Sequence, residues 1–132
     1  MDSRPRLVLT GAAGFLGKRL VARLSNGWRN EAIDREPPDA GTLVRRPNVH
    51  WHRLDLGEAR EVTPLFERLR ATGGATAVLH LAAHYDFSGG EHPEYLRTNV
   101  EGTRRLLDAC DGLDLERFVF ASSLAACEFP RA

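Results

Sequence analysis

The sequence has little lysine, little cysteine and no long apolar run. Lys18 is the one lysine, beside seventeen arginines, which restricts any chemistry that depends on a lysine amine. The two cysteines, Cys110 and Cys127, lack the spacing of metal ligands, so we expect reduced thiols, no metal site and a cytoplasmic location. No apolar stretch approaches the ~18 residues that cross a bilayer, which predicts a protein without a membrane span.

The charge balance argues against partners that bind through a general electrostatic field. Eighteen basic residues stand against eighteen acidic ones, a formal net charge of zero. We therefore expect no nucleic acid partner and no anionic membrane surface, and a partner chosen by a local site instead. A chain of 132 residues that is 42% hydrophobic is long enough for one domain with its own core.

The hydrophobic pattern alternates between strands and helices. Apolar runs predict strands at residues 6–10, 31–34, 49–54, 77–82 and 117–121. Helical spacing predicts helices from Phe15 to the stop at Asn26, over residues 62–71, and from Pro93 to Cys110, the last with Leu96, Val100, Thr103, Leu107 and Cys110 on one face. Strands joined by helix-length crossovers predict an α/β fold, a doubly wound parallel sheet of about five strands with helices on both faces.

Three glycines at three-residue intervals lie where the first strand gives way to the first helix. They are Gly11, Gly14 and Gly17 in the segment Thr10-Gly-Ala-Ala-Gly-Phe-Leu-Gly. Glycine allows positive φ in a turn, lets the backbone approach a pyrophosphate and permits tight contact between helix and strand. The start of the helix offers unpaired amides and a partial positive charge. The segment therefore predicts a phosphate-binding turn.

The spacing of this turn, T-G-x-x-G-x-x-G, is one residue longer than G-x-G-x-x-G. Downstream stand VLHLAA at residues 78–83, TNVEGT at 98–103 and FVFASS at 118–123. In this order the segments resemble the short-chain dehydrogenase/reductase superfamily, in particular its extended branch of nucleotide-sugar epimerases, dehydratases and related reductases. The resemblance implies that residues 1–132 form a Rossmann-like dinucleotide-binding domain that is incomplete, truncated after the fifth strand, with the C-terminal substrate part absent.

Asp34 bears on which dinucleotide is bound, because it ends the second predicted strand, 17 residues after Gly17. A carboxylate there accepts hydrogen bonds from the adenosine ribose hydroxyls and repels a 2′-phosphate, which favours NAD. Arg35 follows at once, and an arginine could instead pair with that phosphate. NAD is thus the expected cofactor and NADP the less favoured alternative.

The resemblance implies further cofactor contacts. Asp55 and Leu56 would lie against the adenine ring, and the small side chains after the fourth strand would leave room for the dinucleotide. The full set of expected cofactor residues is Gly11, Gly14, Phe15, Leu16, Gly17, Asp34, Arg35, Asp55, Leu56, Leu81, Ala82, Ala83, Tyr85, Asn99 and Ser122.

The resemblance also implies a catalytic Ser or Thr, Tyr and Lys that act beside hydride transfer to the nicotinamide. Ser123 matches the Ser or Thr, with Ser122 as the neighbouring candidate. Tyr-x-x-x-Lys is missing, since Tyr85 is followed four residues later by Gly89 and Tyr95 by Asn99. We therefore expect this chain alone to be inactive, with the motif supplied by a missing segment or a second polypeptide.

Another hypothesis also fits the missing Tyr and Lys: a non-catalytic dinucleotide-binding sensor or scaffold. Either way the open edge beside the fifth strand predicts self-association or a partner. His80 lies within a strand pattern, which favours a packed, hydrogen-bonded histidine over a base.

Overall fold

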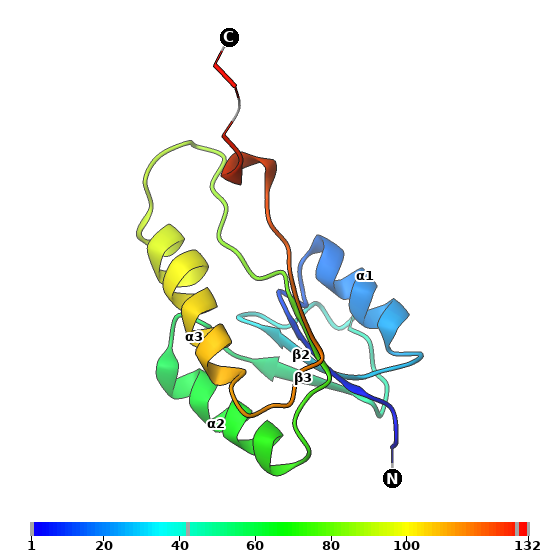
Figure 1. Ribbon diagram of the computed structural model, residues 1–132. Helices are drawn as coiled ribbons and strands as arrows, with labels where there is room; N and C mark the ends of the chain where they lie inside the picture. The colour runs from blue at the N-terminus through cyan, green and yellow to red at the C-terminus, as the bar shows by residue number, and fades with distance from the viewer. Residues whose placement is uncertain (1, 42, 129, 132) are drawn as a thin grey trace.

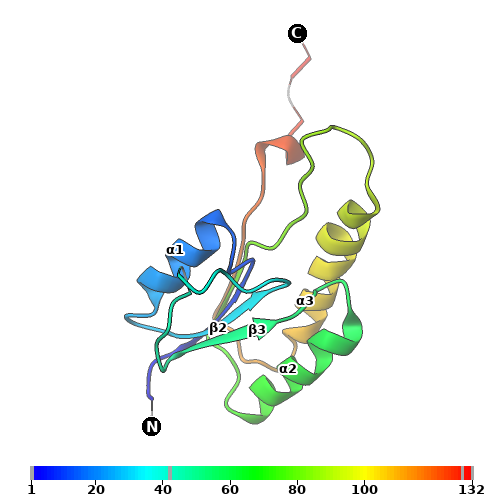
Figure 2. The ribbon, with the colours of Figure 1, turned by 180° about the vertical axis from the view of Figure 1, so that it is seen from behind.

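The computed structural model describes residues 2–41, 43–128 and 130–131. Within these residues five parallel strands form one sheet of order β3-β2-β1-β4-β5 (Figures 1 and 2). The strands are β1 (Arg6–Thr10), β2 (Arg29–Asp34), β3 (Val49–Arg53), β4 (Ala77–His80) and β5 (Arg117–Phe120). The helices are α1 (Phe15–Leu24), α2 (Ala59–Ala71), the π-helix η1 (Tyr95–Gly102), which runs on into α3 (Thr103–Ala109), and the short 3-10 helix η2 (Leu124–Ala126).

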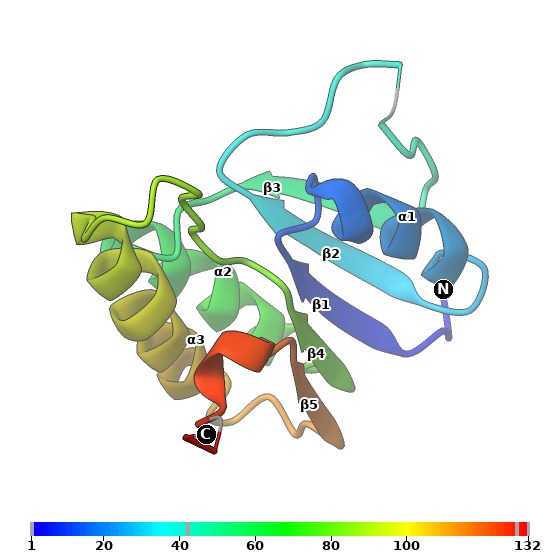
Figure 3. The ribbon, with the colours of Figure 1, turned by 90° about the horizontal axis from the view of Figure 1, so that it is seen from above.

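Helices cover both faces of the sheet, as predicted. Helix α1 lies on one face, and α2 and α3 lie on the other (Figure 3). The chain moves outward from β1 through β2 to β3, then crosses over to β4 on the opposite side of β1. Right-handed crossovers in the two directions place their helices on opposite faces. The direction reverses between β1 and β4, and open α/β sheets bind ligands at such a switch point.

The described core has one cluster on each face of the sheet. On the side of α2 and α3, Val8 and Val78 pack with Phe66 and Leu106, all fully buried. On the α1 side, Leu9, Ala32 and Val21 form the centre of the second cluster. Every residue of β1 is buried, because β1 has a neighbouring strand on each edge and helices over both faces.

Strand β2 begins two residues earlier than the hydrophobic pattern predicts. Arg29 and Asn30 pair with the first residues of β1 although neither is apolar. The Asn30 amide nitrogen donates to the Trp28 carbonyl and its backbone amide donates to the Asn48 carbonyl. These bonds let polar residues occupy a buried strand, so the period of apolar residues could not locate its start.

The predicted inward face of the third helix was only partly right: Thr103 contacts His80 and Cys110 packs against the core, but the other three residues are exposed. Leu96, Val100 and Leu107 are 61%, 47% and 51% exposed, and it is Thr98 and Gly102 of η1 and Leu106 of α3 that are buried. A Cβ on Gly102 would lie 3.3 Å from the Leu56 Cβ, so this small residue lets the helix approach the segment after β3 closely. Close approach at glycine, rather than the apolar stripe, selects the packed face. None of the described helices has the length and apolar composition of a membrane span.

Candidate dinucleotide-binding site

A hollow of about 270 Å³ opens at the carboxyl ends of the first four strands. It is lined by Gly11, Gly14, Ile33, Asp34, Arg35, Leu54, Asp55, Leu56, Leu81, Ala82, Ala83 and Thr98. Nine of these were expected cofactor residues from the sequence. Ile33, Leu54 and Thr98 were missed, although Thr98 lies within the TNVEGT segment and could have been included on that ground.

The glycine turn at the base of the hollow has no room for side chains at two positions. Gly11 has φ of +69°, and a Cβ there would lie 2.8 Å from the amide nitrogen of Ala82. A Cβ on Gly17 would overlap the Gly11 carbonyl oxygen and lie 2.8 Å from the Ala12 Cα. Gly11 therefore brings the turn against the end of β4, and Gly17 brings α1 against the turn.

Some backbone amides of the turn and of the start of α1 donate hydrogen bonds to the described residues, and others do not. Those of Ala12 and Ala13 donate to the Ile33 carbonyl and the Asp34 carboxylate. In the described part of the chain, no protein group accepts a hydrogen bond from the amides of Phe15, Leu16 or Gly17, the first turn of α1. Free amides at a helix start bind anions, and the helix dipole adds to that attraction.

Phe15 and Leu16, two of the expected cofactor residues, present their side chains to solvent at the start of α1. The two side chains are 76% and 52% exposed and do not line the hollow. The Arg19 guanidinium lies over the Phe15 ring, 4.0 Å from its centre. The apolar side chains at the start of α1 therefore lie outside the hollow.

Asp34 ties the end of β2 to the glycine turn. Its Oδ2 accepts from the Ala13 amide at 2.9 Å, and its Oδ1 accepts from the Arg35 amide at 2.7 Å. The carboxylate lines the hollow at the same time. It is thus held in one orientation at the position where the sequence predicts ribose binding.

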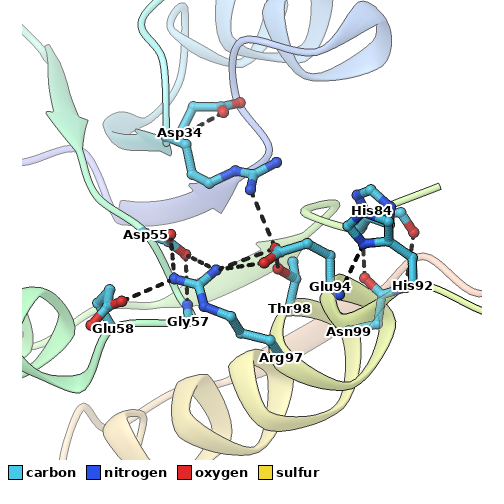
Figure 4. Close-up of polar contacts among 11 residues, drawn as sticks. Asp34, Asp55, Gly57, Glu58, His84, His92, Glu94, Arg97, Thr98 and Asn99 are labelled. Atoms are coloured by element: carbon cyan, nitrogen blue, oxygen red, sulfur yellow. Dashed lines mark hydrogen bonds and ion pairs between the residues drawn. The ribbon is translucent and has the colours of Figure 1, made fainter. Parts of the chain in front are cut away.

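A cluster of charges closes the side of the hollow formed by β3 and η1 (Figure 4). Arg97 Nη2 donates to Asp55 Oδ2 at 2.7 Å and to Glu58 Oε1 at 3.1 Å, and Arg97 Nη1 lies 3.2 Å from Glu94 Oε2. Burial alone would raise the pKa of Asp55, but hydrogen bonds from Arg97 and the Gly57 amide outweigh it and hold that pKa below its usual value. Asp55 is therefore an ionised, oriented acceptor.

Beneath the turn, His80 joins three elements through its ring. Thr10 Oγ1 lies 2.6 Å from His80 Nδ1 and 3.2 Å from the amides of Leu81 and Ala82. Because the two amides donate to Thr10 Oγ1, its hydroxyl donates to Nδ1; Nε2 then carries the ring proton and donates to Thr103 Oγ1 at 2.8 Å. Burial lowers the pKa of His80 to about 4. The ring is neutral and packed, as the strand pattern predicts.

Asn99 and Tyr85 take positions outside the lining of the hollow. Asn99 Oδ1 accepts from the His84 amide at 2.6 Å, and its Nδ2 donates to the His84 carbonyl at 2.9 Å (Figure 4). Asn99 thereby fixes the segment after β4 and does not line the hollow. Tyr85 is 68% exposed and its ring contacts Phe87 instead.

The structure does not bring Ser122 and Ser123 to the hollow. Both are exposed, and Ser123 Oγ accepts from the Ala125 amide at 3.2 Å, which caps η2. In the ranges that the structure describes, no group of three or more His, Cys, Asp or Glu side chains is placed to hold a metal ion. The charged side chains that line the hollow lie at or just after the carboxyl ends of β2 and β3, and Ser122 and Ser123 do not contribute to the lining.

Comparison with known proteins places this geometry in a family. The sequence model of the NAD dependent epimerase/dehydratase family matches residues 7–132. The dTDP-glucose 4,6-dehydratase of Streptomyces antibioticus is 35% identical over 132 residues, a match that covers 89% of this chain and 37% of that enzyme. This chain thus spans about a third of the length of the curated relatives that it matches.

Solved structures agree on the fold. An epimerase from Methanothermobacter thermautotrophicus superposes with a TM-score of 0.81 at 23% identity, over 96% of this chain and 37% of the other. A UDP-glucose 4-epimerase from Thermus thermophilus, solved in complex with NAD, superposes with a TM-score of 0.73 at 29% identity, over 89% of this chain and 37% of the other. The architecture is Rossmann-like, and the chain belongs to the NAD-dependent epimerase/dehydratase family.

Proposed function

We propose that this chain is the NAD-binding portion of an extended short-chain dehydrogenase/reductase that works as an epimerase, dehydratase or reductase. One observation carries the proposal: the amides of Phe15, Leu16 and Gly17, which bond to no acceptor among the described residues, lie at a turn that has no room for side chains at Gly11 and Gly17. Such an arrangement suits a pyrophosphate, whose charge the amides and the helix dipole would stabilise.

The rest of the hollow fits the remainder of NAD. Asp34 keeps further acceptor capacity on both carboxylate oxygens for ribose hydroxyls, and its charge disfavours a 2′-phosphate. Ala82 and Ala83 line the hollow with small side chains, which leaves space across the sheet edge. Asp55, ionised and oriented by Arg97, would accept from the adenine amine.

Bound NAD would accept or return a hydride. The residues of this chain would bind and orient the NAD. Ser123 would hydrogen-bond the substrate oxygen once its own capping bond to Ala125 is exchanged. The proton-transferring Tyr-x-x-x-Lys is absent from these 132 residues, so a further segment or a second polypeptide would supply it. The related enzymes named above act on different substrates, so they favour no particular one.

Exposed apolar side chains on β5 support a partner at that edge. Val119 and Phe120 are 42% and 55% exposed, and β5 is paired on one side only. An open edge with apolar side chains is a surface that proteins usually cover. The same segment or polypeptide that supplies the tyrosine and lysine would pack here.

The test is an NADH fluorescence titration of the 132-residue chain with matched glycine variants. Gly17→Ala introduces the overlap with Gly11, whereas Gly27→Ala places its Cβ in open space. We expect saturable binding by the wild type and by Gly27→Ala, and at least about a tenfold loss for Gly17→Ala.

Circular dichroism identifies a Gly17→Ala chain that has unfolded, and Asp34→Ala then serves as the second variant. A folded wild type that shows no saturable response to NADH contradicts the proposal. So does a folded Gly17→Ala chain that binds as tightly as Gly27→Ala.

The absence of Tyr-x-x-x-Lys favours a second candidate, a dinucleotide-binding sensor or scaffold without catalysis. The coding sequence downstream of residue 132 separates the two. A Tyr-x-x-x-Lys some two dozen residues beyond Ser123 supports the enzyme, whereas a stop codon with no partner polypeptide favours the sensor.

A further inference from the structure

Two neighbouring residues at the ribose corner of the hollow carry opposite preferences. Asp34 repels a 2′-phosphate, while Arg35 carries the one positive charge among the described residues that line the hollow. The side chain of Arg35 is 49% exposed, so burial alone does not fix its position. What holds Arg35 therefore bears on which dinucleotide is preferred.

Glu94, 59 residues further along the chain, holds Arg35. Arg35 Nη1 lies 3.4 Å from Glu94 Oε2, so the guanidinium is drawn toward the start of η1. The contact is an ion pair between a partly exposed arginine and a carboxylate that is 23% exposed. Its strength depends on how firmly Glu94 is itself fixed.

Glu94 is fixed by its own helix (Figure 4). Thr98 Oγ1 donates to Glu94 Oε2 at 2.7 Å, and Arg97 Nη1 lies 3.3 and 3.2 Å from the two carboxylate oxygens. Chiefly through the Thr98 hydrogen bond, the pKa of Glu94 lies below its usual value. The carboxylate is ionised and fixed in place, so it competes directly with any phosphate for Arg35.

We propose that Glu94 is a positioning residue that sets the preference for NAD over NADP by withholding Arg35 from the ribose corner. With Arg35 paired to Glu94, Asp34 acts without opposition and excludes the 2′-phosphate. Without that carboxylate, Arg35 is released to form a charge-assisted pair with the phosphate. The inference rests on the proposed function, since it requires the dinucleotide to bind in this hollow.

The experiment is a titration of the 132-residue chain with NADH and with NADPH. Glu94→Gln keeps the shape of the side chain and removes the charge. We expect the ratio of NADPH to NADH affinity to rise by about tenfold in Glu94→Gln, and the gain to vanish in Glu94→Gln combined with Arg35→Met. Glu91→Gln is the matched control, because it removes an equal charge from the exposed residue three positions earlier and leaves the ratio unchanged.

Arg35→Met in the wild-type background keeps the proposal testable if Glu94→Gln does not fold. Because Glu94 already occupies Arg35, this variant should change NADPH affinity by less than about twofold; a larger loss overturns the inference. An unchanged affinity ratio in folded Glu94→Gln overturns it too, while NADH binding by the wild type leaves the proposed function intact. Failure of the folded wild type to bind NADH overturns both.

Discussion

The region at the carboxyl ends of β1, β2 and β3 differs from the region after β5 in how firmly its polar side chains are held. Around β1, β2 and β3, Asp34 and Asp55 are held by hydrogen bonds from the turn and from η1. Around β5, Ser122 and Ser123 are exposed and the strand is largely uncovered. The polar side chains at the ends of β2 and β3 are thus held by hydrogen bonds within the described chain, whereas those after β5 are exposed to solvent.

The sharpest contrast in stability is between Phe66 and Phe120. Phe66 of α2 is fully buried, whereas Phe120 of β5 is 55% exposed. We expect Phe66→Ala to lower the free energy of unfolding by about 3–5 kcal/mol, through lost burial and the cavity left behind. Phe120→Ala should change it by about 0.5 kcal/mol or less. Urea unfolding followed by circular dichroism measures both, and equal effects would contradict the contrast between the two regions.

The next effect is a loss of stability in acid that comes from His80. Burial lowers its folded pKa to about 4 from an ordinary value of 6.5, so the unfolded chain binds the proton more readily. The stabilisation is fully present above pH 6.5 and is lost as the pH falls toward 4. Between pH 7 and pH 5 we expect a loss of roughly 2 kcal/mol in the free energy of unfolding.

His80→Gln supplies the control for this prediction, because it removes the titrating ring and keeps hydrogen-bonding groups near Thr10 and Thr103. Urea unfolding at pH 7 and pH 5 should show a smaller acid loss in His80→Gln than in the wild type. The same acid loss in both proteins would mean that other groups cause it.

The smallest expected difference compares two polar side chains that hold loops. Asn99→Ala removes both hydrogen bonds to the His84 backbone, so it should lower the free energy of unfolding by about 1–2 kcal/mol. Ser123→Ala removes one capping bond on exposed η2 and should cost about 0.5 kcal/mol or less. Hydrogen exchange of the His84 amide should accelerate in Asn99→Ala alone. Acceleration in Ser123→Ala would show that the two regions are coupled.

Local pattern was sufficient for the fold and for the phosphate turn. The parallel sheet, the helices on both faces and the glycines of the turn follow from patterns within short segments of the sequence, although the atoms that crowd Gly11 belong to the end of β4. Asp34 also lies at its predicted place on the hollow, because a strand end is a local feature.

The ion pairs on the charged side of the site could not be predicted, because the paired residues are distant in sequence. Arg97 contacts Asp55 across 42 residues, and Arg35 contacts Glu94 across 59. Arg97 carries no pattern that separates it from the other arginines, and Arg35 was expected beside the ribose but not paired with Glu94. The face of the third helix was only partly predicted for a related reason, since the position of Gly102 against Leu56 is set by tertiary packing.

The bond between the Asp34 carboxylate and the Ala13 amide constrains any attempt to redesign cofactor choice. Replacing Asp34 is the direct way to favour binding of NADP, but it would also remove the hydrogen bond that holds the glycine turn in place. A gain in selectivity at the adenosine ribose would then be offset by weaker binding of the pyrophosphate. Substituting Glu94 instead leaves the bond between Asp34 and Ala13 intact. The preference between NAD and NADP could then be changed without changing the overall affinity for the dinucleotide.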